Sequence, residues 1–173
     1  GPLLSRAVAV LRLGHRPSPG LESMEPKTPK LNVPLPTLGG KQLWADLFVY
    51  SGYRIQENTV TGHCRLLGPR DARLEWGSYA ECHEHFEALR VQRRLERPSD
   101  HLVLLLHGIF RAKEAFYPMR RSLLAAGYDA EALNYPSTQA TIESHADQVE
   151  RLLDHLEEVR TVSFVTHSMG GLV

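Results

Sequence analysis

The second half of the chain alternates between apolar runs of strand length and amphipathic stretches. The runs at 101–106 and 161–166 suit strands that are buried on both faces, and 129–135 can form another strand that ends before Pro136. The stretches between them, 113–126 and 141–158, place apolar residues at helical spacing. Strand, helix, strand, helix, strand in this order predicts parallel strands with right-handed crossovers and helices that cover the sheet.

The first half of the chain has a different pattern. Residues 43–79 contain short aromatic and β-branched segments separated by turn signals, which is typical of an antiparallel β meander. Residues 80–96 have the pattern of a helix, and we interpret the arginines near its end as a solvated face. We therefore divide the chain into an N-terminal arm or linker, 1–40, which is rich in Pro and Gly, and one larger unit, 41–173. The larger unit contains the meander, 43–79, and a βαβαβ core, 101–173.

Both ends of the chain suggest a piece of a longer protein. The apolar stretch 3–13 is interrupted by two arginines, and we favour a frayed helix or a misassigned start over the remnant of a targeting segment. The chain finishes inside an apolar, helix-like stretch, 170–173, with no stop signal after it. No apolar run approaches the roughly 20 residues that cross a bilayer, so we expect no transmembrane segment.

Composition narrows the classes of function. The 173 residues include 20 Lys and Arg against 20 Asp and Glu, and this zero net charge argues against a nucleic-acid-binding protein. The two cysteines, Cys64 and Cys82, favour free buried thiols over a disulfide. The compartment stays open, with the cytoplasm slightly favoured over export, and the oligomeric state is not indicated.

Ser168 lies in the segment with the clearest chemical pattern, Thr166-His167-Ser168-Met169-Gly170-Gly171. A serine directly after a buried strand and before a helix can sit on a very tight turn that projects its hydroxyl out of the sheet. Gly170 and Gly171 would let the backbone pass close to neighbouring strands. The N–H groups at the start of the helix would stabilise negative charge on a bound carbonyl. A serine that only caps the next helix is the plain alternative, but it leaves the two glycines unexplained.

The segment from Thr166 to Gly170 resembles the G-x-S-x-G nucleophile elbow of the α/β-hydrolases, with threonine at the first position. The string His-Ser-Met-Gly-Gly is similar to bacterial lipases and esterases. His107-Gly108, after the apolar strand 101–106, resembles the family's His-Gly pair. The resemblance implies an incomplete, mostly parallel α/β-hydrolase sheet with flanking helices, preceded by the antiparallel segment. It implies Ser168 as nucleophile, the N–H groups of Ile109 and Met169 as oxyanion hole, and five supporting residues: His107, Gly108, His167, Gly170 and Gly171.

The implied reaction is hydrolysis of a carboxylic ester through an acyl-enzyme, with no cofactor. A small-molecule or lipid-like substrate is expected because four loop residues are apolar: Ile109, Phe110, Phe116 and Met169. In this family the catalytic acid and histidine follow the serine, so we expect both after residue 173. We accordingly expect the 173-residue chain to be inactive and poorly soluble, with an unpaired edge on its last strand. An acyltransferase or thioesterase on the same fold, or a non-catalytic hydrolase-like binding protein, is the alternative.

A second cluster contains residue types that bind metals. His63-Cys64 and the run Cys82-His83-Glu84-His85 match no strong zinc pattern. On a helix His83 and His85 would not share a face. We therefore expect no metal site and a structural role for these residues.

Overall fold

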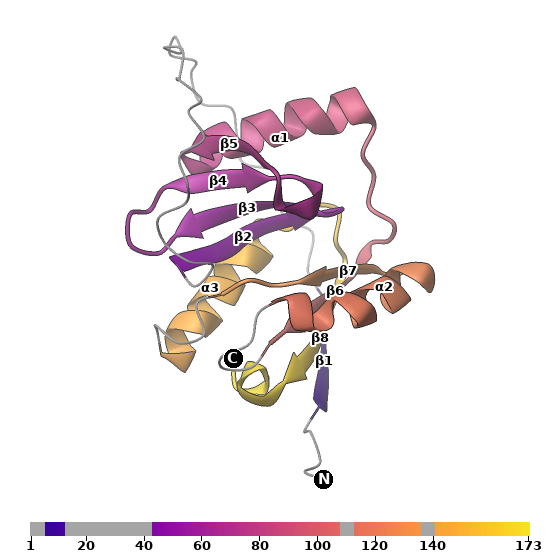
Figure 1. The fold of residues 1–173 in the computed structure, drawn as a ribbon. Coiled ribbons are helices and arrows are strands. Elements are labelled where there is room, and N and C mark those ends of the chain that lie inside the picture. The colour runs from indigo at the N-terminus through magenta and orange to yellow at the C-terminus, as the bar shows by residue number, and fades with distance from the viewer. Residues whose placement is uncertain (1–5, 13–42, 108–112, 136–140) are drawn as a thin grey trace.

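The computed structural model describes residues 6–12, 43–107, 113–135 and 141–173. Two four-stranded sheets form the framework, with helices packed against them (Figure 1). The mixed sheet has the order β1 (Arg6–Arg12), β8 (Thr161–His167), β6 (His101–Leu106), β7 (Asp129–Ala132). The antiparallel sheet has the order β2 (Trp44–Tyr50), β3 (Tyr53–Asn58), β4 (Cys64–Leu67), β5 (Arg73–Gly77). The helical elements are α1 (Tyr79–Arg93), α2 (Tyr117–Ala125), α3 (Ile142–Asp154) and three 3-10 turns, η2 (Pro69–Asp71), η3 (Lys113–Phe116) and η4 (Ser168–Gly171).

Strand β6 is the centre of the mixed sheet and runs parallel to both β7 and β8. Its side chains alternate between two apolar clusters, because successive residues of a strand point to opposite faces. Leu104 packs in a cluster with Leu152 of α3, whereas Leu105 packs in a second cluster with Phe116 and the apolar side of α2. The two helices therefore cover opposite faces of the sheet, and the continuous apolar run of β6 is explained by burial on both sides.

The antiparallel sheet packs on α1, which provides Cys82 and Phe86 to its core. Helix α1 begins with a capping box in which Ser78 Oγ accepts from the Glu81 N–H at 3.2 Å and Glu81 Oε2 accepts from the Ser78 N–H at 2.8 Å. Within the described residues, none of the helices combines the length and the apolar composition that crossing a membrane requires.

The prediction of a mostly parallel α/β-hydrolase sheet is wrong. In the described part of the chain, two of the six strand pairings are parallel and four are antiparallel. The physical reason is that β2 to β5 close a core of their own against α1 instead of extending the mixed sheet. The antiparallel segment is thus a second sheet as large as the first.

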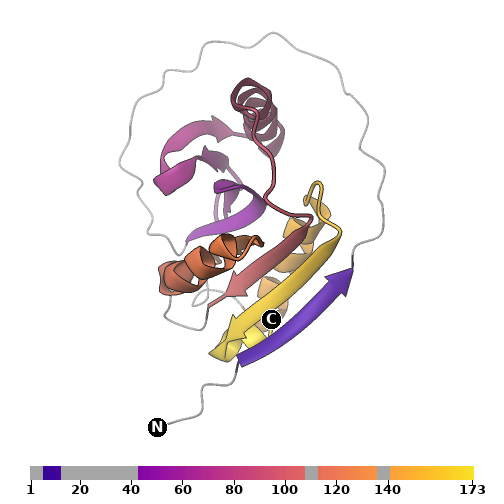
Figure 2. The same cartoon turned by 90° about the vertical axis from the view of Figure 1, so that its right-hand side faces the viewer.

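Of the two interpretations that we favoured for the stretch 3–13, the frayed helix is wrong, because residues 6–12 form strand β1, and the misassigned start stays a prediction. It lies antiparallel along β8, from Arg6 opposite His167 to Arg12 opposite Thr161 (Figure 2). The alternating Ala and Val residues of this segment suit a strand, and β8 provides an edge whose backbone groups need partners. The predicted unpaired edge of the last strand is therefore covered by β1. The rest of the predicted linker, 13–40, lies outside the described residues.

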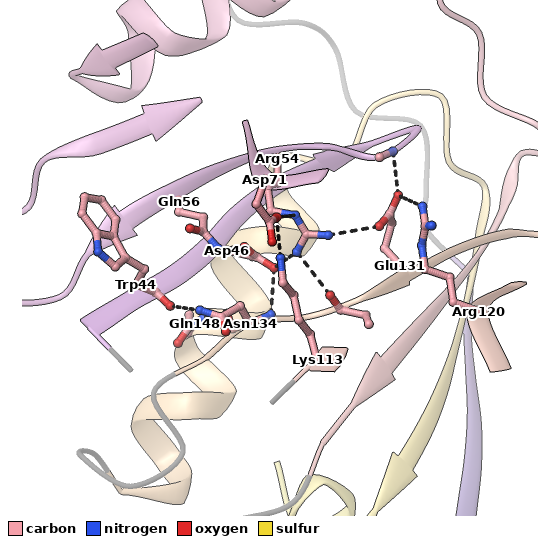
Figure 3. A network of polar contacts seen from close by, with 12 residues as sticks. Trp44, Asp46, Arg54, Gln56, Asp71, Lys113, Arg120, Glu131, Asn134 and Gln148 are labelled. Carbon is pink, nitrogen blue, oxygen red and sulfur yellow. Dashed lines mark hydrogen bonds and ion pairs between the residues drawn. The ribbon is translucent and has the colours of Figure 1, made fainter. Parts of the chain in front are cut away.

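A buried network of charges joins the antiparallel sheet to β7 (Figure 3). Arg54 of β3 donates from Nη1 to Asp46 of β2 at 2.8 Å and from Nη2 to Glu131 of β7 at 3.4 Å. Glu131 also accepts from Arg120 of α2 at 3.0 Å, and Asp46 accepts from the backbone N–H of Asn134 at 2.8 Å. Because each charge has at least one partner of opposite sign, the network fixes β2, β3, β7 and α2 relative to one another.

Arg97 forms a second junction at the opposite end of β7. Its guanidinium donates to Asp129 at 2.6 Å, to the Val49 carbonyl at 2.6 Å and to the Glu157 carbonyl at 2.8 Å. One side chain thus joins β7, β2 and the turn between α3 and β8. With the network around Arg54, it holds β7 to the antiparallel sheet at both ends.

Replacing Arg54 by Met is expected to lower the free energy of unfolding by about 3–5 kcal/mol, because the buried Asp46 would lose the arginine that pairs with it and Glu131 would keep Arg120 alone. The control is Arg151→Met, which breaks an ion pair with Glu57 at 2.7 Å whose arginine side chain is 51% exposed. That change is expected to cost about 0–1 kcal/mol. Urea unfolding of both variants measures the difference, and equal costs would contradict a structural role for the buried network.

Candidate active site

Ser168 occupies a sharp bend between strand β8 and turn η4. Its φ of +56° lies in the left-handed region, and the residue is exposed at the surface. This conformation costs an L-residue other than glycine roughly 1–2 kcal/mol. A strained backbone persists only where the surrounding structure holds it in place, and such positions are frequent at functional sites. The bend presents a serine at the carboxyl end of a buried strand, as the sequence predicts.

Gly170 brings this bend against the end of β6. A Cβ built on Gly170 would lie 2.6 Å from the Leu106 carbonyl oxygen and 3.0 Å from that of His107. The first distance is too short for any side chain and the second is unusually tight, and both of these oxygens belong to the backbone. The serine bend and the end of β6 that leads into His107 are therefore in direct contact, even though His107 and Ser168 are 61 positions apart in the sequence.

Thr166 stands where the elbow pattern has its first glycine, and the absence of a side chain at Gly171 leaves room for it. The threonine is buried and pairs with Leu106 in the sheet. Its Oγ1 lies 3.2 Å from where a Cβ on Gly171 would stand. The bulk of the threonine side chain thus takes the space that the missing side chain of Gly171 leaves.

His107 has a fixed position beneath the bend. It is 2% exposed, and its ring stacks on that of Tyr135 with centroids 4.3 Å apart and planes at 8°. The Tyr135 hydroxyl donates to the His107 carbonyl oxygen. Gly108 and Ile109 lie outside the described residues. Met169 contributes its backbone to η4, and its side chain lies outside the described part.

A general base for Ser168 is not brought to it by the described residues. His167 is half-buried on β8, and among the described residues no histidine forms a hydrogen bond with the Ser168 hydroxyl. The structure therefore brings together the predicted nucleophile, the glycine turn and the end of the His107 strand. The acid and histidine of a triad stay a prediction.

Tyr135 and His145 belong to this region and were missed by sequence reasoning. His145 of α3 is 1% exposed and packs on Tyr135, with ring centroids 5.1 Å apart. Burial, and secondarily the charge of His107, lowers the pKa of His145, so its ring is neutral near pH 7. One feature of the sequence points to Tyr135: it comes shortly after β7, the strand that pairs with β6.

The other nucleophile candidates are buried thiols. Cys64 and Cys82 are free, as predicted, and both lie in the core between α1 and the antiparallel sheet. Burial raises the pKa of Cys64 to about 11 and that of Cys82 to about 12. Neither forms a thiolate near neutral pH, so neither is a candidate nucleophile there.

The residues with metal-binding side chains separate along α1. His83 bonds to Glu157 at 3.0 Å, and His85 bonds to Glu75 at 3.0 Å, so they do not share a site. The ligand atoms of His83, Glu87 and Glu157 lie within 4.8 Å of one another. Arg90, however, contacts Glu87 at 3.5 Å and Glu157 at 3.4 Å, and it already supplies positive charge there. This arrangement fits an ion-pair cluster better than a metal site.

The predicted apolar lining of the site loses one member. Phe116 is 8% exposed and packs into the cluster of Val103, Leu105, Ala130 and Ala132. It therefore belongs to the core beneath α2. Ile109 and Phe110 lie outside the described residues.

The strain at Ser168 is tested by comparing Gly with Ala at this position. Ser168→Gly is expected to be more stable than Ser168→Ala by about 1 kcal/mol, because glycine adopts the left-handed region without a Cβ clash. At Ser122, exposed in α2, the order is expected to reverse, with Ala more stable than Gly by about 1 kcal/mol. Thermal unfolding of the four variants gives the comparison. The same order at both positions would contradict the strained bend.

The close approach of η4 to β6 is tested by Gly170→Ala. The added Cβ meets backbone oxygen that has no freedom to move, so we expect a loss of about 1–3 kcal/mol in unfolding free energy. Gly171→Ala is the control, because its nearest contact is a side-chain atom of Thr166 at 3.2 Å. We expect a smaller loss there. Urea unfolding measures both, and a neutral Gly170→Ala would show that the bend does not contact β6.

Comparison of the chain with protein-family models, with curated proteins and with solved structures found no match in any of the three. The features of this chain that bear on function are the local geometry of Ser168, Gly170 and His107.

Proposed function

We propose that this chain carries the nucleophile of a serine hydrolase that cleaves carboxylic esters through an acyl-enzyme. The observation that supports it is the exposed Ser168 in a left-handed bend at the carboxyl end of a buried strand. A serine with an ordinary capping role has no need of a strained backbone at that position. The direct contact of Gly170 with the end of β6 adds the second half of the expected arrangement.

In the proposed reaction, Ser168 Oγ attacks the ester carbonyl carbon while its proton passes to a histidine base. The N–H groups of Ile109 and Met169 stabilise the negative charge on the carbonyl oxygen. The bond to the alcohol breaks and the alcohol takes the proton from the histidine. A water molecule then attacks the acyl-serine by the same route, which releases the acid and restores the serine.

The histidine and its acid are part of the proposal, because the described residues bring none to Ser168. We expect them in the product of the complete gene, in agreement with the sequence pattern. A cofactor has no step in this scheme. The substrate is proposed as a small or lipid-like ester on the strength of the apolar residues Ile109, Phe110 and Met169 near the motif.

The experiment is fluorophosphonate labelling of the complete gene product, followed by mapping of the modified peptide. We expect the label on Ser168, and we expect hydrolysis of p-nitrophenyl butyrate to fall by at least about 10³-fold in Ser168→Ala, the scale seen when a nucleophile is removed. Ser163→Ala on the same strand is the control, since that hydroxyl contacts His101 at 2.8 Å, away from the bend.

Two results would contradict the proposal. One is a label on a residue other than Ser168. The other is esterase activity that survives Ser168→Ala unchanged. The 173-residue chain, assayed in parallel, is expected to show no turnover.

A further inference from the structure

Helix α3 has two buried residues, His145 in its first half and Leu152 in its second. Leu152 packs in the apolar cluster beneath the helix, and Arg151 next to it forms an ion pair with Glu57 at 2.7 Å. The second half is thus held by an apolar side chain and a salt bridge. In the first half the buried side chain is a histidine, which is 1% exposed.

The ring of His145 is buried without a hydrogen bond. Both Nδ1 and Nε2 are shielded from solvent, and neither bonds to any of the described residues. Buried polar side chains in native structures nearly always have a partner. The ring packs instead on that of Tyr135, with centroids 5.1 Å apart and planes at 60°. His145 therefore anchors the first half of α3 as an uncharged ring.

The carboxylates near His145 are not placed to neutralise a charged ring. Its neighbours on α3, Glu143 and Asp147, are exposed at the surface. Strand β2, which also packs on α3, carries Asp46, and that carboxylate is paired with Arg54 at 2.8 Å. Within the described part of the chain, no carboxylate contributes to the pKa of His145. A proton on this ring would add a buried charge that has no counter-ion.

The other titratable groups beside His145 come from the end of β6 and from the segment after β7. Burial raises the pKa of Tyr135 to about 12, so its hydroxyl stays neutral, and it donates to the His107 carbonyl oxygen. The His107 ring stacks on Tyr135 at 4.3 Å, and a charge on it opposes a charge on His145. Burial first, and the charge of His107 second, therefore lower the pKa of His145 below its ordinary value.

This difference between folded and released states sets the direction of the pH dependence. A histidine exposed to water takes up its proton at a pKa of about 6.5. The buried ring of His145 resists protonation, so the packed state is favoured above that pH. As the pH falls through about 6.5, a state that exposes the ring binds one more proton than the packed state and gains population.

We propose that His145 is an acid-sensitive latch: while neutral it holds the first half of α3 on Tyr135, and when protonated it releases that half. A protonated ring has two N–H donors, and both reach water once the start of the helix moves away from Tyr135. The second half stays attached through Leu152 and the ion pair of Arg151. The latch does not depend on the proposed function, because it involves no step at Ser168.

Hydrogen exchange of the 173-residue chain at pH 7 and pH 5.5 tests the latch, with rates corrected for the intrinsic effect of pH. We expect the amides of residues 145–149 to lose up to about tenfold in protection at the lower pH, because opening takes up one proton. The amides of α1 are expected to change little. His145→Phe keeps a ring against Tyr135 and binds no proton, so the pH-dependent loss should be absent in this variant.

His155→Phe is the matched control, with the same substitution at the other end of the same helix. His155 Nδ1 contacts the Arg151 carbonyl oxygen at 2.7 Å, and the ring is partly exposed, so an acceptor and water are both available to its charged form. We expect this variant to keep the pH dependence of the wild-type chain. Loss of protection in His145→Phe equal to that of the wild type, or its absence in His155→Phe, would overturn the latch.

Two further results separate a latch from titration of the whole fold. An equal loss of protection in α1 and α3 of the wild-type chain would show global unfolding and would overturn the proposal. If His145→Phe does not fold, an NMR titration of the His145 ring in the wild-type chain decides the question. We expect its signals to change together with the exchange of α3, and a ring that takes up its proton while α3 stays protected would contradict the latch.

Discussion

The contact between the turn after Ser168 and the end of β6 determines the geometry of the candidate site. Strand β8 must end beside β6, and the chain must then bend over the strand end without a side chain in the way. Gly170 meets this requirement, since its missing Cβ leaves room for two backbone oxygens at 2.6 and 3.0 Å. The bend that results places Ser168 in a left-handed conformation at the rim of the sheet. The close packing of Gly170 on β6 and the strained backbone of Ser168 therefore occur in the same turn.

The rest of the molecule keeps that point in place. Parallel pairing of β6 with β8 aligns Leu106 with Thr166, so both strands end at the same level. Strand β7 pairs with the other side of β6 and leads into Tyr135, which bonds to the His107 carbonyl. The buried charges of Arg54 and Arg97 hold β7 against the antiparallel sheet. That second sheet thus supports the site without contributing a predicted catalytic residue.

The sequence predicts the elements that carry a continuous apolar run or an apolar stripe, although only three of the seven residues of β8 are buried. The apolar runs of β6 and β8 and the amphipathic stripe of α3 each carry a periodicity that has one good interpretation. Strand β1 was missed because its arginines interrupt a short apolar segment, and its pairing with β8 depends on chain far away in sequence. The sequence pattern gives no sign that the charged residues Asp46, Arg54 and Glu131 are buried. Their burial depends on mutual neutralisation across two sheets, which no local pattern expresses.

The candidate site was predictable to a similar extent. Ser168 and Gly170 stand in a motif whose spacing reflects a local backbone requirement, so the bend could be expected from the residues alone. Tyr135 carries no motif, and its link to His107 spans 28 positions. The mostly parallel sheet implied by the resemblance was wrong because the local motif does not determine how the first half of the chain packs. A bend such as that at Ser168 is a local arrangement, and different surroundings can support it.

A crystal structure of the complete gene product after reaction with a fluorophosphonate tests most directly whether Ser168 is a nucleophile that faces the end of β6. We expect a phosphorus atom bonded to Ser168 Oγ, with φ of residue 168 still positive. We also expect a phosphoryl oxygen that accepts hydrogen bonds from the Met169 and Ile109 N–H groups at about 2.7–3.1 Å. An adduct on another side chain, or a phosphoryl oxygen that faces away from the end of β6, would contradict this expectation.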